Sequence, residues 1–194
     1  MNNYTFDNNI NFIECYPQVL SHDQCNNIIN TFEHDRRQVE GTVGGGLVNH
    51  AIKHSTDVHA AFNKTTYDEY NNIIRPAVIG GLQLYCGTYD YLMELAPWSI
   101  QDEYNIQKYT HGQGFGKLHC EKQALHPDRT HAWMIYLNDA ESGTQFPYQK
   151  LTTTPKTGDL WIWPAYWTHV HRGVTPNKGR KFIATGWCVF DNDT

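Results

Sequence analysis

The sequence predicts an α+β protein that is mainly β, with two helices near the N-terminus followed by a sandwich or jelly roll. Before residue 98, apolar residues recur at the spacing of buried helix faces. From Trp98 onward, short runs rich in β-branched and aromatic residues are bounded by Gly, Pro, Asn or Asp, which is typical of such all-β architectures. We expect one domain over 1–194, with 1–97 mostly helical support and loop, and 98–194 as the jelly-roll core.

The first helix is predicted from about 22 to 34. Ser21 and Gln24 have the spacing of a capping box, which marks a helix start. The apolar residues that follow recur at i, i+3, i+4 and i+7, and so share one face: Cys25, Ile28, Ile29 and Phe32.

Residues 40–56, EGTVGGGLVNHAIKHST, are glycine-rich and polar, which indicates a loop or irregular hairpin. Its 41–46 part is a candidate lid over a binding site. A second helix is predicted from Tyr67 to about Tyr85, and a kink is expected at Pro76 because proline lacks a backbone donor. Both helices are expected to brace one side of a sheet.

Strands are predicted in the second half wherever a β-branched or aromatic run lies between turn residues. The predicted strands are 104–110, 116–121, 130–138, 144–147, 159–163, 167–172 and 180–190.

Composition and charge argue against several classes of protein. The net charge is −5 and the basic residues are scattered, so no nucleic-acid surface is indicated. The five cysteines are widely spaced and form no CxxC pair, which favours reduced thiols in a cytosol-like compartment. The N-terminus lacks the pattern of a signal peptide, and no apolar run is long enough to span a membrane. We therefore expect a soluble cytoplasmic protein without a membrane or nucleic-acid partner.

The segment GFGKLHCEKQ places His119 and Glu121 two positions apart. In a strand, alternate side chains share a face, so both would project together about 6 to 7 Å apart, within reach of one divalent metal. WTHVHRGVTPNKGRKF supplies two more histidines, His169 and His171, with the same spacing. Two histidines and one carboxylate form the facial triad that holds Fe(II) with open positions, whereas structural zinc prefers four ligands.

A series of spaced motifs extends over the same half. In order, they are Tyr-x-x-Gly (109–112), His-x-acid (119–121), Tyr-Leu-Asn (136–138), Gly-Thr-x-Phe (143–146) and Pro-Lys-x-Gly-Asp (155–159). His171 closes the series, because Gly179 follows it by eight positions and Lys181 by ten. With these motifs, residues from about Tyr104 to Phe190 resemble the Fe(II)- and 2-oxoglutarate-dependent oxygenases, in particular the prolyl 4-hydroxylase-like branch.

The resemblance implies a double-stranded β-helix and a hydroxylase that uses Fe(II), 2-oxoglutarate and O2, with ascorbate as a supporting reductant. It implies hydroxylation of an unactivated C–H, first of a prolyl residue in a peptide or protein, with release of succinate. Residue by residue, it implies that His119, Glu121 and His171 bind the iron and that Lys181 binds the distal carboxylate of 2-oxoglutarate. It implies that the cosubstrate pocket is lined by Tyr109, Tyr136 and Thr144. It also implies that Arg129 and Trp187 face the substrate. His169 is then expected to lie outside the ligand set, next to it or at the surface.

The sequence departs from the family pattern at several points. Glu121 stands where the family has Asp, and the spacing from Gly112 to His119 is about one residue longer. Collagen-type prolyl hydroxylases follow the tryptophan with x-His, but Val189 stands there, which weakens the case for a prolyl peptide. The remaining histidines are expected on the surface or in loops: His22, His34, His50, His54, His59, His111, His126 and His131.

Other functions stay open at this point. The substrate could be a free amino acid or another small metabolite. A cupin-type site could use His169 and His171 with His119, and a non-catalytic β-sandwich could bind sugars or proteins through its many Tyr and Trp side chains.

Overall fold

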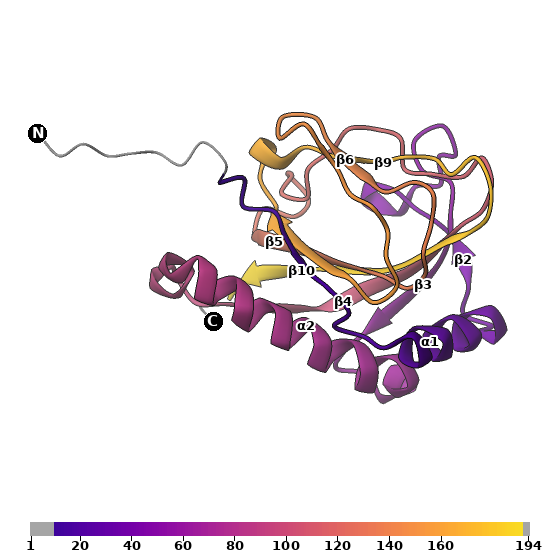
Figure 1. Ribbon diagram of the computed structural model, residues 1–194, viewed down its shortest axis with the longest axis horizontal. Coiled ribbons are helices and arrows are strands. Elements are labelled where there is room, and N and C mark those ends of the chain that lie inside the picture. The colour runs from indigo at the N-terminus through magenta and orange to yellow at the C-terminus, as the bar shows by residue number, and fades with distance from the viewer. Residues whose placement is uncertain (1–9, 192–194) are drawn as a thin grey trace, which may run out of the picture.

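In the computed structural model, which describes residues 10–191, two antiparallel sheets stack and helices cover the outer face of the larger one (Figure 1). The larger sheet contains, in spatial order, β1 (Glu14–Tyr16), β8 (Leu160–Pro164), β5 (Arg129–Tyr136), β10 (Lys181–Phe190), β4 (Trp98–Tyr109), β3 (Thr56–Ala61) and β2 (Val39–Glu40). The smaller sheet contains β7 (Leu151–Thr152), β6 (Thr144–Phe146) and β9 (Arg172–Gly173). The predicted class, a mainly β jelly roll with helices near the N-terminus, is confirmed.

Helix α1 (His22–His34) begins and ends where the sequence predicts. The Ser21 side chain accepts a hydrogen bond from the Gln24 N–H at 3.2 Å, and the Gln24 side chain accepts one from the Ser21 N–H at 2.9 Å. This reciprocal pair satisfies two backbone donors that have no partner within the helix. Cys25, Ile28 and Phe32 are buried against the sheet, as their spacing indicates.

Helix α2 (Asp68–Thr88) continues through Pro76 without ending there. Pro76 lies on the exposed side of the helix, where the carbonyl left without a partner can bond to water. The opposite side of α2 is buried and packs on the larger sheet, with Gly81 against Leu160. Short 3-10 segments complete the helical structure: η1 (Gly44–Gly46), η2 (Thr65–Tyr67), η3 (Asp90–Glu94) and η4 (Trp167–His169).

Alternation along β5 divides the core into two layers. Trp133 and Ile135 belong to the cluster between the larger sheet and the helices. Met134 and Tyr136 belong to the cluster between the two sheets, which also contains Phe146 of the smaller sheet. Successive side chains of a strand point to opposite faces, and both faces of β5 are covered, so every residue of β5 is buried. The space between the sheets is thus lined by alternate residues of the central strands.

Two predicted strands are wrong, and several short strands were not predicted. Residues 116–121 and 167–172 form no strand apart from Arg172; instead, single backbone pairings connect His119 with His171, and η4 occupies the start of the second segment. The N-terminal region, expected to supply mainly helices and loop, also supplies β1, β2 and β3, and β7 was missed as well. β1, β2 and β7 have only two or three residues, too few to show a period of two.

No helix within residues 10–191 is both long enough and apolar enough to cross a membrane. The five cysteines are all free thiols, and Cys25 and Cys188 are buried. Burial raises the pKa of the Cys25 thiol to about 11, so this side chain behaves as a neutral apolar group in the core.

The packing on the helix side of the sheet can be tested at Trp133, which is fully buried. We expect Trp133→Ala to lower the free energy of unfolding by about 3–5 kcal/mol, because it removes a large buried side chain and leaves a cavity. Trp167→Ala is the matched control, since Trp167 is 71% exposed, and it should change stability by no more than about 0.5 kcal/mol. Urea unfolding followed by circular dichroism measures both; equal losses would contradict the assignment of the core.

Candidate metal centre

Three predicted site residues meet between the two sheets. Ligand atoms of His119, Glu121 and His171 all lie within 4.8 Å of one another, and no other such group of three occurs among residues 10–191. Oε1 of Glu121 lies 3.2 Å from Nε2 of His171 and 3.7 Å from Nε2 of His119. The His171 ring packs against Phe146 and Trp163, whose side chains line the inter-sheet space. The structure therefore brings together the three residues that the sequence grouped, although the strands on which they were placed are absent.

Single backbone pairings, not a strand ladder, bring these residues together. The His119 N–H donates to the His171 carbonyl at 3.0 Å, and the His171 N–H donates to the His119 carbonyl at 2.8 Å. Two positions further, the Glu121 N–H donates to the Ala165 carbonyl at 3.1 Å. Phe115 stacks on the His119 ring with centroids 4.0 Å apart. The segment that carries His119 and Glu121 is thus fixed on both sides without regular secondary structure.

The histidine tautomers suit a bound cation. Nδ1 of His119 lies 2.9 Å from the Lys117 carbonyl, and Nδ1 of His171 lies 2.9 Å from the His169 carbonyl. A carbonyl only accepts hydrogen bonds, so each Nδ1 carries a proton, and in the neutral form of such a ring the lone pair is at Nε2. Burial, assisted by the neighbouring His171, lowers the pKa of His119 to about 4, which keeps this ring neutral. Two nitrogen lone pairs and Oε1 of Glu121 converge, an arrangement that a divalent metal satisfies.

Glu121 is ionised although its side chain is only 12% exposed. Burial alone would raise the pKa of this carboxyl, but the close contact with the His171 imidazole and the nearby positive charge of Arg129 hold the pKa well below its usual range. Its second oxygen, Oε2, accepts a hydrogen bond from Nε1 of Trp187 at 2.7 Å and lies 3.5 Å from Nη1 of Arg129. The two residues expected to face a substrate thus contact the carboxylate.

Lys181 is a buried cation without an acidic partner. It begins β10, is 3% exposed, and pairs with no carboxylate among residues 10–191. Its ammonium donates a long hydrogen bond to the Val174 carbonyl at 3.3 Å and lies 5.2 Å from the Tyr109 ring centroid. Burial lowers the pKa of Lys181 to about 8. Such a group gains free energy from an anionic ligand, because an unpaired buried charge is costly.

The other predicted pocket residues also line the inter-sheet layer. The Tyr136 hydroxyl lies 2.6 Å from the Thr153 hydroxyl and 3.3 Å from that of Thr144. The Tyr109 hydroxyl donates to the Gln107 side chain at 2.9 Å. Gly112, three residues after Tyr109, has φ +77°, a backbone conformation that favours glycine in the turn that leaves β4.

Two further histidines lie outside the cluster. His131, expected at the surface, is instead buried on the helix side of β5 beside Tyr85 and Trp98, and burial lowers its pKa to about 4. His169 is in η4, and its Nε2 is 2.8 Å from the Asn11 carbonyl, so its ring does not belong to the cluster. The His169 carbonyl holds the Nδ1 proton of His171. This arrangement contradicts a cupin-type site built with the His169 ring.

A buried ion pair beside the site was missed. Nζ of Lys53 lies 2.6 Å from Oδ2 of Asp57, and Ser55 and Gln107 donate to the same carboxylate at 2.7 and 3.0 Å. The network continues from Gln107 to Tyr109. Lys53 and Asp57 lie in and just after a segment that looked like a polar loop, and their four-residue spacing would indicate an exposed helical pair. The pairing of β3 with β4 places Asp57, and an isolated backbone bridge with Phe115 places Lys53.

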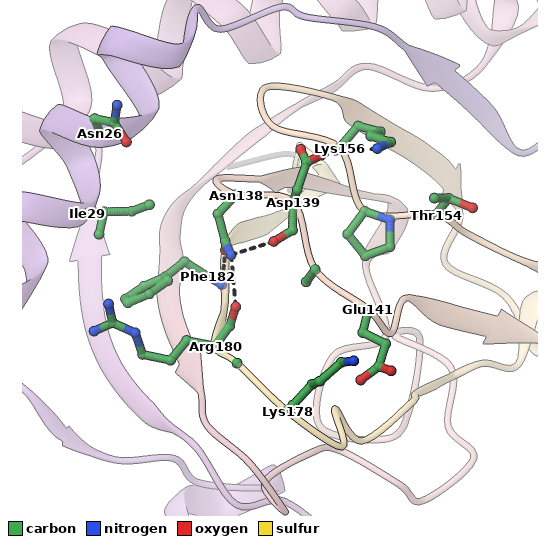
Figure 2. A pocket seen from close by; sticks show the side chains of 13 residues that line it. Asn26, Ile29, Asn138, Asp139, Glu141, Thr154, Lys156, Lys178, Arg180 and Phe182 are labelled. Carbon is green, nitrogen blue, oxygen red and sulfur yellow. Dashed lines mark hydrogen bonds and ion pairs between the residues drawn. The ribbon is translucent and has the colours of Figure 1, made fainter.

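A separate cleft of about 580 Å³ lies between α1 and three turns, which follow β5 and precede β8 and β10 (Figure 2). None of the predicted site residues lines it. Lys156 pairs with Asp139 at 3.0 Å, and the Asn138 side chain accepts a hydrogen bond from the Phe182 N–H at 2.7 Å and donates one to the Arg180 carbonyl at 2.8 Å. Asn138 therefore fixes the start of β10, and with it Lys181.

Two stacked antiparallel sheets that enclose two histidines and a carboxylate are the arrangement of a jelly roll with a facial triad. Residues 104–189 match the family described as the 2OG-Fe(II) oxygenase superfamily. A search among curated proteins found no significant match.

Solved structures of low sequence identity share the fold. A viral collagen prolyl hydroxylase from Paramecium bursaria Chlorella virus-1, in complex with 2OG, is 17% identical, with 91% of this chain and 95% of that chain covered and a TM-score of 0.62. A Trichoplax adhaerens prolyl hydroxylase in complex with a hypoxia inducible factor peptide is 12% identical, with 94% and 85% covered and a TM-score of 0.72. SnoK, a carbocyclase from nogalamycin biosynthesis, is 13% identical, with 92% and 79% covered and a TM-score of 0.67.

The buried ion pair supports a stability prediction. Lys53→Met should lower the free energy of unfolding by about 3–5 kcal/mol, because it leaves the Asp57 carboxylate buried without its cation. Lys156→Met is the matched control: Lys156 and Asp139 form an ion pair of similar length, but their side chains are 59% and 58% exposed, so the loss should be at most about 1 kcal/mol. Urea unfolding of both variants tests this, and a Lys53→Met protein as stable as the control would contradict it.

Proposed function

We propose that this protein is an Fe(II)- and 2-oxoglutarate-dependent dioxygenase that hydroxylates an unactivated C–H bond. The observation that carries the proposal is the convergence of His119, Glu121 and His171, each with a potential ligand atom directed into one small space. Three protein ligands leave coordination positions for a cosubstrate and oxygen, unlike a closed structural site. Bound iron, with O2 and 2-oxoglutarate, supplies the oxidising chemistry and yields succinate and CO2.

The protein's own residues bind and orient the reactants. Lys181 is the proposed partner of the distal carboxylate of 2-oxoglutarate, because it is a buried ammonium without an acidic neighbour among residues 10–191. Tyr109, Tyr136 and Thr144 are proposed to line the same pocket, since their side chains lie in the layer between the sheets. The apolar surroundings, Phe146 and Trp163, keep water away from the reacting centre.

The proposed substrate is a prolyl residue in a peptide or protein. Support comes from the resemblance of the motifs and from the prolyl hydroxylases that share the fold. A small metabolite is the second candidate, because Val189 replaces the histidine of collagen-type enzymes and a carbocyclase shares the fold as well.

The 41–46 segment remains our candidate for a lid. Gly45 and Gly46 have φ values of +78° and +76°, and a methyl group added to Gly44 would contact Leu125, four residues after Glu121. At the end of the loop that follows, the His54 N–H donates to the Gly114 carbonyl at 2.8 Å. Movement of this segment would therefore affect the backbone close to His119.

Succinate formation tests the proposed function. Purified protein with Fe(II), ascorbate and 2-oxoglutarate under air should release succinate, and His171→Ala should reduce the rate by at least about 100-fold, because a metal ligand is lost. His169→Ala is the matched control, since its ring lies outside the cluster, and it should retain most of the activity.

The substrate class is read from the same assay. Stimulation by proline-rich peptides, with hydroxyproline detected by mass spectrometry, would support the prolyl proposal, and stimulation only by free amino acids would favour the small-molecule alternative. Absence of both succinate formation and metal binding in the wild type would refute the proposed function and favour the non-catalytic binding protein.

Binding of 2-oxoglutarate should depend on pH through Lys181. The pKa of this lysine is about 8 in the free protein, and a bound carboxylate raises this pKa. The affinity for 2-oxoglutarate is therefore at its maximum below about pH 8. Above it, affinity should fall by up to about tenfold per pH unit until the pKa of the complex is reached. In Lys181→Arg the cation stays charged, so this loss should disappear. Isothermal titration calorimetry with Mn(II)-loaded protein measures both; an unchanged affinity in Lys181→Met would contradict the assignment.

A further inference from the structure

The two oxygens of Glu121 face different neighbours. Oε1 faces the imidazole nitrogens, 3.2 Å from His171 and 3.7 Å from His119. Oε2 faces away from them and accepts the Trp187 indole N–H at 2.7 Å, with the Arg129 guanidinium 3.5 Å away. A carboxylate held in this way presents a single oxygen to the centre of the cluster.

A register shift in the sheet places Arg129 at this point. In regular alternation Arg129 would share a face with His131 and Trp133, which point to the helices. The pairing of β10 with β5 instead passes from Cys188 opposite His131 to Val189 opposite Arg129, so Thr130 is an extra residue on β5. One extra residue reverses the face of the residues beyond it. Arg129 therefore joins the face of Ala132, between the two sheets.

Arg129 and Trp187 also hold each other in place. The guanidinium carbon lies 3.6 Å from the Trp187 ring centroid, which is the geometry of a cation–π contact. Arg129 is 7% exposed, and within residues 10–191 Glu121 is the acid with which it pairs. Its charge is therefore balanced by the same carboxylate that the indole holds, and the two side chains form one clamp around Oε2.

We propose that Arg129 and Trp187 are positioning residues that hold Oε2 of Glu121 and leave Oε1 for the metal, in place of the substrate contacts that the family resemblance implies. This inference rests on the proposed function, since it needs a metal at the cluster. It also accounts for glutamate at a position where the family has aspartate. The longer side chain reaches both the cluster and the clamp, and the clamp removes the rotational freedom that an extra methylene adds.

Metal affinity, measured without turnover, tests the clamp. Mn(II) binding to the whole protein is titrated by electron paramagnetic resonance, which reports the free ion. Trp187→Phe removes the N–H donor and keeps an aromatic ring beside Arg129; the metal Kd should rise about 10-fold or more. Trp161→Phe is the matched control, because Trp161 packs on the same inter-sheet cluster and its Nε1 has no partner among residues 10–191. The control should leave the Kd unchanged.

The Glu121→Asp background separates positioning from general structure. An aspartate is shorter by about 1.5 Å, the length of one C–C bond, and cannot contact Nε1 of Trp187 while it remains beside His119 and His171. Trp187→Phe should then change the Mn(II) Kd by less than about 3-fold in that background. A loss of packing at position 187 would weaken binding equally in both backgrounds.

The outcomes are distinct. A large effect of Trp187→Phe in the wild-type background, with little effect in the Glu121→Asp background, supports the clamp. Equal effects in both backgrounds overturn it. The clamp is also overturned if Trp187→Phe leaves the metal affinity unchanged and loses only substrate-stimulated succinate formation. That result would favour the substrate contacts that the family resemblance implies for Arg129 and Trp187. Failure of the wild type to bind Mn(II) overturns the proposed function as well, so the two failures are told apart by the wild-type titration.

Discussion

The burial of one carboxylate is the constraint on which the rest of the site depends. Glu121 is ionised in a space closed by two sheets, and an isolated charge there would be strongly unfavourable. The indole of Trp187 and the guanidinium of Arg129 satisfy one oxygen, and the ring nitrogens of His119 and His171 surround the other. Nε2 of each ring faces Oε1, and this convergence of two nitrogens and one oxygen is what suits the cluster to a divalent metal.

Strand β10 carries residues for both functions proposed for the site, which are binding of 2-oxoglutarate and positioning of the metal ligand Glu121. Lys181 at its start carries the buried cation that suits a dicarboxylate, and Trp187, six residues later, reaches Glu121. Both side chains point between the sheets because they follow the alternation of one strand. The hydrogen bonds of Asn138 to the backbone of Arg180 and Phe182 fix where this strand begins. The helices that cover the other face of the sheet let the central strands be buried on both sides.

The motifs and patterns in the sequence predicted much of this arrangement, and the parts that they did not predict have physical reasons. The capping box and the apolar spacing predicted α1 to the residue, because local contacts decide where a helix starts. The motifs grouped His119, Glu121 and His171, which do meet, but the strands on which they were placed do not exist. The backbone there is held by isolated pairings between distant segments, which leave no periodic signal. His131 was misplaced at the surface for a similar reason, since the aromatic residues that bury it come from α2 and β4.

The sequence by itself determined the mainly β class, the first helix and the residue types that a metal site needs, because each depends on local pattern or on chemistry carried by single side chains. The tertiary structure alone decided the partners of Glu121, the burial of the Lys53–Asp57 pair and the isolation of Lys181. Each of these depends on how distant segments pair, and a single extra residue at Thr130 is enough to turn Arg129 from the helix side to the site. Register is set by pairing between segments far apart in the chain, so no local pattern could reveal it.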